Sequence, residues 1–183
     1  MQRALVDLAR RGDEEAFADL ARAVGDRLMA IAYRILRDAD RAEDAVQQTL
    51  VTAWRELPTL RDDDRFDAWL RRILVNACYA EARRRRRWTN NIRALPADGP
   101  TAPDGLATVL DRDRLDRGFR RLPPQQTAIF VLHHYVGLTL PEIAEELGVP
   151  LGTVKSRLHY ATQALRSALD ADARTAPSTE RLA

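Results

Sequence analysis

The chain of 183 residues carries apolar side chains at helical spacing along most of its length. Residues three and four apart lie on one face of an α-helix, so this spacing predicts amphipathic helices. In the first half we expect them over residues 2–10, 13–36, 40–57 and 66–86. No segment alternates apolar and polar residues as a half-buried strand does. The pattern therefore predicts an all-α protein.

Residues 89–110 interrupt this periodicity with several prolines and glycines and few apolar residues that could build a core. Such a composition is typical of a flexible linker. Helical spacing resumes at Leu110 and continues to about Leu169. We therefore predict two small helical domains joined by a flexible linker. The expected bounds are 1–88 for the N-terminal domain, 89–110 for the linker, 111–170 for a C-terminal helix-turn-helix domain and 171–183 for a disordered tail.

Residues 138–165 have the pattern of a helix-turn-helix. Thr139 and Glu142 stand at the spacing of a capping box, and Gly148 is a natural left-handed stop for the first helix. The second helix begins between Pro150 and Thr153. Its apolar residues fall in one narrow arc: Val154, Leu158, Ala161, Leu165 and Leu169. In a helix-turn-helix, two short helices are joined by a compact turn, and the second helix enters the DNA major groove.

The outer face of the second helix is polar and basic. Thr153 stands at its start, and the candidate DNA contacts that follow are Lys155, Ser156, Arg157, His159 and Tyr160. Cations contact phosphates, whereas hydroxyl and imidazole groups reach base edges. The same pattern also fits an ordinary helical hairpin with a solvated polar face.

Composition narrows the class of protein. Apolar residues make up 45% of the chain and charged residues 31%, which suits a folded helical protein. There is no run of 18 apolar residues and no signal peptide, so we expect a cytoplasmic protein without membrane insertion. Cys78, the only cysteine, excludes an internal disulfide and a Cys-rich zinc site. No catalytic triad or metal-ligand spacing is visible, so we predict no enzyme, no catalytic residue, no metal and no cofactor.

The net charge is only +2, but the charges are segregated. Residues 66–88 hold seven arginines against two carboxylates, and Arg83–Arg87 are consecutive. This is the footprint of a phosphate-backbone site, or else of a solvated charge run. Trp69 in the same segment is either a stacking platform for bases or part of the core. Asn76 lies among apolar residues and needs a hydrogen-bond partner, which a base edge would provide.

The predicted helix over residues 40–57 has an unusual outer face. Its apolar stripe consists of Ala42, Val46, Leu50, Ala53 and Leu57. The opposite side mixes amides, charges and one aliphatic side chain: Asp44, Gln47, Gln48, Val51 and Arg55. That face is either a docking site for a helix of another protein or a plain solvated surface.

In this order, these segments resemble a bacterial RNA polymerase sigma factor of the extracytoplasmic-function subgroup. The resemblance covers about residues 12–169. It rests on Gly12–Phe17, Ala42–Leu50, Phe66–Leu70 with Ile73 and Asn76, Leu122–Pro123 and Gly152–Leu158. Three positions depart from the family pattern. Ala80 stands where an acidic residue is frequent, and the recognition helix has Tyr160 and Thr162 where arginine is frequent.

The resemblance assigns a role to each surface. The residues that would grip the clamp helices of the polymerase largest subunit are Asp44, Gln47, Gln48, Val51 and Arg55. Those that would read and melt the promoter −10 element are Leu60, Arg61, Asp62, Asp63 and Asp64 in a loop, Asn76 lining a pocket for a flipped base, Trp69 and Arg72 as further DNA contacts, and Arg83 and Arg84 on duplex phosphates. The helix-turn-helix would read the −35 element through Thr153, Lys155, Ser156, Arg157, His159 and Tyr160.

The resemblance therefore implies an alternative sigma factor that does no covalent chemistry. Its implied partners are core RNA polymerase, through the clamp helices and the flap of the second-largest subunit, promoter DNA and an anti-sigma protein. The competing interpretation is a stand-alone dimeric helix-turn-helix regulator that binds a palindrome. That interpretation leaves the basic segment at residues 66–88 without a role.

Overall fold

The computed structural model describes residues 2–91 and 118–175, and every regular element in those ranges is helical. The N-terminal part consists of α1 (Gln2–Arg10), α2 (Glu14–Leu36), α3 (Ala39–Glu56), two 3₁₀ turns, η1 (Leu57–Thr59) and η2 (Asp63–Arg65), and α4 (Phe66–Asn91). The C-terminal part consists of α6 (Pro124–His134), α7 (Leu140–Leu147) and α8 (Leu151–Thr175). The prediction of an all-α protein is confirmed.

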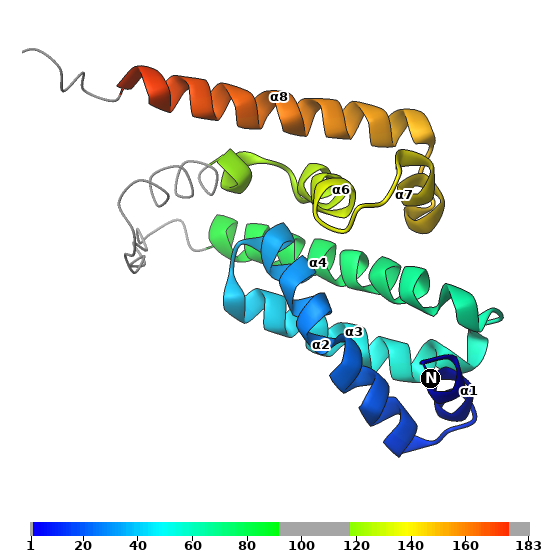
Figure 1. The fold of residues 1–183 in the computed structure, drawn as a ribbon. Coiled ribbons are helices and arrows are strands. Elements are labelled where there is room, and N and C mark those ends of the chain that lie inside the picture. Colours follow the sequence, from blue (N-terminus) through cyan, green and yellow to red (C-terminus); the bar gives the residue numbers. More distant parts are fainter. Residues whose placement is uncertain (1, 92–117, 176–183) are drawn as a thin grey trace, which may run out of the picture.

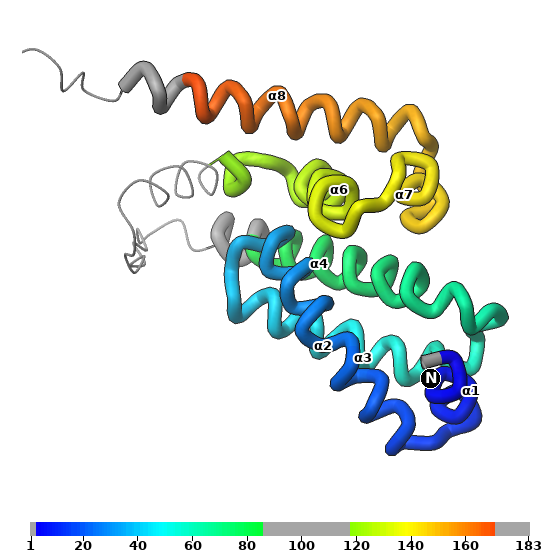
Figure 2. The backbone as a smooth tube through the Cα atoms, viewed as in Figure 1, coloured from blue at the N-terminus to red at the C-terminus, as the bar shows by residue number. Residues whose placement is uncertain are grey.

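The helices stack in layers (Figure 1). In the N-terminal part α3 packs against both α2 and α4, and α1 packs against α2. In the C-terminal part α6 and α7 pack against α8. The tube view shows the short helices α6 and α7 between the long helices α4 and α8 (Figure 2), and both short helices contact α4. The C-terminal part thus rests directly on the N-terminal helices.

One buried cluster runs through both parts. It extends from Val6 in α1 through Leu28, Leu74 and Ile129 to Val154 in α8, each fully shielded from solvent. A smaller cluster joins Phe119 and Leu122 to Ala161 and Leu165 of α8. Burial of apolar surface is the main stabilising term in folding, so the two parts are mutually stabilising in this arrangement.

Local signals in the sequence account for the helix starts. The Asp13 carboxylate caps α2 by accepting from the Ala16 amide at 3.0 Å, and Asp38 caps α3 by accepting from Arg41 at 3.2 Å. Each carboxylate satisfies one of the amides that lack a partner in the first helical turn.

Two helices run a few residues past the bounds expected from the sequence. Helix α4 continues to Asn91, so the first residues of the predicted linker 89–110 are helical, and the rest of that linker lies outside the described residues. Helix α8 likewise continues to Thr175, into the tail predicted as disordered from residue 171. Residues 171–175, Ala-Asp-Ala-Arg-Thr, contain good helix formers, whereas residues 89–91, Thr-Asn-Asn, continue the helix of the preceding arginine run Arg83–Arg87.

The turn between α7 and α8 depends on Gly148, whose φ is +65°. A side chain costs about 1 kcal/mol in this left-handed region. We therefore expect Gly148→Ala to lower the free energy of unfolding by about 1 kcal/mol, measured by chemical denaturation. The matched control is Gly25→Ala, because Gly25 lies inside α2 with an ordinary φ and open space around it. It should instead raise that free energy by about 0.5–1 kcal/mol. Equal effects at both positions would contradict this reading of the turn.

Candidate functional site

Helix α3 presents one broad face to solvent. Its exposed residues include Asp44, Gln47, Gln48, Val51 and Arg55. The buried side consists of small residues, Ala42, Ala45, Thr49 and Ala53. Val46 and Leu50, which we expected in the buried stripe, are only half-buried. The small residues turn inward because α3 packs against both α2 and α4.

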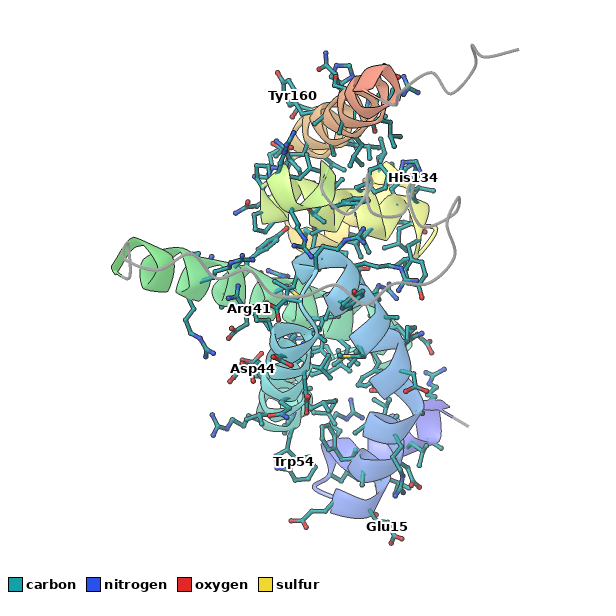
Figure 3. The ribbon with its side chains drawn as sticks, turned by 90° about the vertical axis from the view of Figure 1, so that its left-hand side faces the viewer. Glu15, Arg41, Asp44, Trp54, His134 and Tyr160 are labelled. Carbon is teal, nitrogen blue, oxygen red and sulfur yellow. The ribbon has the colours of Figure 1, made fainter. Side chains whose placement is uncertain are left out.

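Hydrogen bonds and one ion pair hold several side chains on the exposed face of α3. The Gln47 amide donates to Glu43 at 3.2 Å, and the Gln48 amide donates to the Thr52 hydroxyl at 3.2 Å. Asp44 pairs with Arg84 of α4 at 3.2 Å, and its carboxylate points outward (Figure 3). The ion pair connects the face predicted to bind polymerase with the arginine run predicted to hold DNA.

The acidic loop between α3 and α4 is held against α1. Asp62 caps η2 by accepting from the Asp64 amide at 3.0 Å. Asp63 pairs with Arg10 at 3.2 Å and Asp64 pairs with Arg3 at 3.4 Å. Leu60 is only 8% exposed, so its side chain anchors the loop. The loop is therefore fixed in place by α1.

A cavity of about 460 Å³ lies between this loop, α4 and α7. Its lining contains five of the residues predicted to read the −10 element: Leu60, Arg61, Asp62, Trp69 and Arg72. The other lining residues are Arg65, Ala68, Glu145 and Glu146, and the sequence analysis identified none of them. An aromatic ring and cations are groups that hold an unstacked base and its phosphates, and in this cavity three arginines lie beside three carboxylates.

Trp69 is half-buried, and its ring centroid is 5.9 Å from that of Phe66. The ring therefore belongs partly to the core and partly to the cavity wall. Asn76 is exposed on α4 and is not part of the cavity lining, which ends one turn earlier at Arg72. Because Asn76 is exposed, water can satisfy its amide, so the free protein does not require the hydrogen-bond partner that we expected from the sequence. Arg83 and Arg84 are exposed further along the same helix.

The helix-turn-helix has the predicted local structure. Glu142 accepts from the Thr139 amide at 2.7 Å and the Thr139 hydroxyl accepts from the Glu142 amide at 3.4 Å, which completes the capping box. The hydrogen bonds from Thr139 lower the pKa of Glu142. Of the residues predicted to read DNA, four are exposed: Lys155, Ser156, His159 and Tyr160. Figure 3 shows Tyr160 at the opposite end of the molecule from Glu15.

The other two predicted DNA contacts of α8 are less open. Thr153 is half-buried, and its carbonyl accepts from the Ser156 hydroxyl at 3.1 Å. Arg157 is also half-buried and lies close enough to Tyr79 of α4 to lower the pKa of that phenol. Burial has the larger effect and raises the pKa of Tyr79 to about 12. Arg157 therefore faces α4 in this arrangement as well as the outer surface of α8.

The described residues give little support for a metal site, a membrane-spanning segment or a reactive thiol. No group of three or more His, Cys, Asp or Glu side chains in these ranges could hold a metal ion. None of the described helices is long and apolar enough to cross a membrane. Cys78 is a free, buried thiol, and burial raises its pKa to about 12.

Comparison with known proteins identifies both halves of the chain. Residues 20–88 match the family model for Sigma-70 region 2, and residues 112–165 match that for Sigma-70, region 4. The chain is 36% identical over 166 residues to the ECF RNA polymerase sigma factor SigL of Mycobacterium tuberculosis, covering 86% of this chain and 93% of the relative. It is 27% identical over 172 residues to SigW of Bacillus subtilis, covering 87% and 92%.

Solved structures agree with these relatives. One is CnrH in complex with the cytosolic domain of CnrY, with 29% identity, a TM-score of 0.67 and coverage of 93% of this chain and 98% of that one. Another is RpoE in complex with the anti-sigma factor NepR from Bartonella quintana, with 27% identity, a TM-score of 0.68 and coverage of 85% and 98%. The chain belongs to the extracytoplasmic-function (ECF) family of RNA polymerase sigma factors.

Proposed function

We propose that this protein is an alternative sigma factor that binds core RNA polymerase, directs it to promoters with −10 and −35 elements and starts DNA melting. The observation that carries the proposal is the combination of the Trp69 and Arg72 cavity with an exposed helix-turn-helix face in one member of the ECF family. The family members are transcription initiation factors, so no covalent chemistry is required of the chain.

Each surface then has one task. The exposed face of α3 binds the clamp helices of the largest subunit. The cavity and the Arg83–Arg84 region hold the −10 element, and the exposed face of α8 holds the −35 element. We assign residues 1–88 to the first domain, 89–110 to a linker in the polymerase channels and 111–170 to the domain that also contacts the flap of the second-largest subunit.

The free-energy cost of unstacking a base and the gain from tethering favour a factor that opens promoters only together with polymerase. Taking a base out of the stack costs a few kcal/mol, which contacts to the flipped base and its phosphates offset. Once the chain is bound to polymerase and to one promoter element, the second contact becomes intramolecular, so each reader can be weak alone. The net charge of +2 fits a protein with little affinity for DNA by itself.

We also propose an anti-sigma protein as a partner and the cytoplasm as the site of action. Support for the partner comes from CnrH, solved with CnrY, and from RpoE, solved with the anti-sigma factor NepR. Bacterial RNA polymerase works in the cytoplasm, which supports the location.

Transcription from a library of randomised promoters, with purified core polymerase, tests the proposed function. Sequence-specific initiation that depends on the added chain would support it. If the chain alone protects a palindrome and adds nothing to core polymerase, the protein is a stand-alone dimeric regulator. That alternative is not favoured, because it gives no role to the α3 face or to the cavity.

Asn76 provides a sharper test of the −10 assignment. Asn76 is exposed on α4 one turn beyond the cavity, where its amide can meet a neighbouring base edge. We expect Asn76→Ala to reduce open-complex formation about tenfold, as expected for loss of a bidentate base contact. Its affinity for core polymerase should not change. Gln48→Ala, which removes an exposed amide from α3, is the matched control and should show the reverse pattern. If Asn76→Ala still melts promoter DNA normally, Asn76 is not one of the residues that read the −10 element.

A further inference from the structure

Arg10, the last residue of α1, contacts the acidic loop between α3 and α4 at two points. Its Nη1 atom donates a hydrogen bond to the Leu60 carbonyl at 3.3 Å and lies 3.2 Å from Oδ1 of Asp63. Its Nη2 atom donates to Asp7 of α1 at 2.9 Å, which holds the guanidinium in place. One arginine therefore joins α1 to the backbone and to a side chain of this loop.

The Asp63 carboxylate depends on this contact. Its side chain is 13% exposed, and its Oδ1 atom accepts no hydrogen bond from the residues that the structure describes. A buried carboxylate oxygen without an opposite charge is costly, and the Arg10 guanidinium supplies that charge. Loss of Arg10 would therefore favour loop conformations that return the carboxylate to water.

The charged residues of the loop divide between two sides. Arg61 and Asp62 line the cavity, together with Trp69 of α4. Asp63 and Asp64 do not belong to the described lining and pair instead with arginines of α1. The side held by α1 thus determines where the two residues on the cavity side stand.

Helix α1 is a firm support for such a contact. Val6 and Ala9 are buried in the shared core, and α1 packs against α2, η1 and η2. Figure 1 shows α1 at the end of the molecule where α3 finishes and α4 begins. A residue on a packed helix holds its neighbours in one geometry more precisely than a residue on a loop does.

We infer that Arg10 is a positioning residue for recognition of the −10 element, and that Asp63 supports the loop and does not touch a base. The inference rests on the proposed function, which assigns this loop to the −10 element. A loop held in one conformation presents Arg61 and Asp62 to a base without an ordering cost, so discrimination between bases depends on the support. Without Arg10 the loop samples several conformations, and the preferred base loses its advantage.

Transcription by core polymerase with the full-length chain tests this role. Two promoters from the randomised library are compared, and they differ only at the −10 base on which the unchanged chain discriminates most. One mismatched base typically costs about tenfold in affinity, so we expect Arg10→Ala to reduce a preference of about tenfold to less than about threefold. Its affinity for core polymerase should not change. A merely structural role would lower transcription from both promoters equally and leave their ratio unchanged.

Arg11→Ala is the matched control. Arg11 follows Arg10 in the chain and also pairs with Asp7, at 2.8 Å, but its side chain is 74% exposed. Its hydrogen bonds and ion pair within the described residues stay on α1. The preference ratio of this variant should therefore stay within about twofold of that of the unchanged protein. Equal losses from the two substitutions would overturn the assignment to Arg10.

Asp63→Asn separates support of the loop from contact with a base. The amide keeps the shape of the side chain but loses the charge that faces Arg10. We expect it to lower the preference ratio as Arg10→Ala does, and the double variant to lose no more than either single one, because both break the same contact. Losses that multiply would mean that Asp63 reads a base and would overturn its assignment as a support. If Arg10→Ala fails to fold, Arg10→Gln takes its place, since it keeps a donor for Leu60 without the charge.

Amide hydrogen exchange measures the loop in the absence of DNA and polymerase. The amides of Leu60 and Arg65 donate to the carbonyls of Leu57 and Asp62 at 3.0 and 3.1 Å, so their exchange reports the order of the loop. We expect about tenfold faster exchange at both in Arg10→Ala, with the amides of α2 unchanged.

Unchanged exchange in Arg10→Ala, or a preference ratio equal to that of the unchanged protein, would overturn the inference. A chain that directs no promoter-specific transcription would instead count against the proposed function. Exchange would still show in that case whether Arg10 holds the loop, so the two failures are distinguishable.

Discussion

Val51→Asp is expected to weaken binding to core RNA polymerase by about a hundredfold. Val51 is 45% exposed at the centre of the α3 face, where its neighbours are Gln47, Gln48 and Arg55. In the free protein the new carboxylate remains in water and costs little. In the complex it would be buried in an apolar contact without a partner, which costs several kcal/mol. Binding is measured by titrating labelled protein with core polymerase.

Leu8→Asp is the matched control for Val51→Asp. Leu8 is 46% exposed on α1, so the substitution introduces the same charge at an equally exposed apolar position. Its polymerase affinity should stay within about twofold of that of the unchanged protein. Equal losses from both substitutions would mean that α3 is not the docking face and that the added charge itself is responsible.

Leu74→Ala is expected to lower the free energy of unfolding by about 2–5 kcal/mol. Leu74 is fully buried in α4, the helix that contacts α2, α3, α6 and α7. The loss combines the transfer free energy of the deleted atoms with the cost of the cavity that remains. Since domains of this size are stable by only about 5–15 kcal/mol, the variant should melt well below the unchanged protein.

Chemical denaturation followed by circular dichroism measures this loss. Leu8→Ala deletes the same atoms at an exposed position and should change the free energy of unfolding by less than about 0.5 kcal/mol. A loss of under about 1 kcal/mol for Leu74→Ala would show that α4 is not at the centre of the shared core.

Features set by neighbouring residues could be predicted from the sequence. The Thr139–Glu142 capping box and the left-handed Gly148 need only local chemistry, and both are present. The outward position of Lys155, Ser156, His159 and Tyr160 follows from helical periodicity alone and is also found. Their contacts with DNA remain a prediction.

Features that depend on how segments dock could not be predicted in the same way. Periodicity placed Val46 and Leu50 in the buried stripe of α3, but close packing against two helices buries Ala45 and Thr49 instead. The prolines and glycines of residues 89–110 predicted a linker that begins at residue 89, yet α4 continues to Asn91.

The carboxylates of α7 that line the cavity, Glu145 and Glu146, are a second example of a feature that the sequence predicts only in part. Glu146 falls three residues after buried Ile143, so its position on the inward side of α7 was visible in the sequence. Its partner Arg71 was not, because nothing local relates residues 75 positions apart. The pairing arises only when the helix-turn-helix rests on α4, and that contact is a property of the tertiary arrangement.

Permanganate footprinting tests the central claim, promoter opening by polymerase through this chain, most directly. The template is a promoter recovered from the randomised library, and the readout is thymine reactivity in its −10 element. The account predicts reactivity only when core polymerase and the chain are both present, and a loss of about tenfold with Asn76→Ala. Equal reactivity without the chain, or protection of DNA by the chain alone with no opening by polymerase, would contradict it.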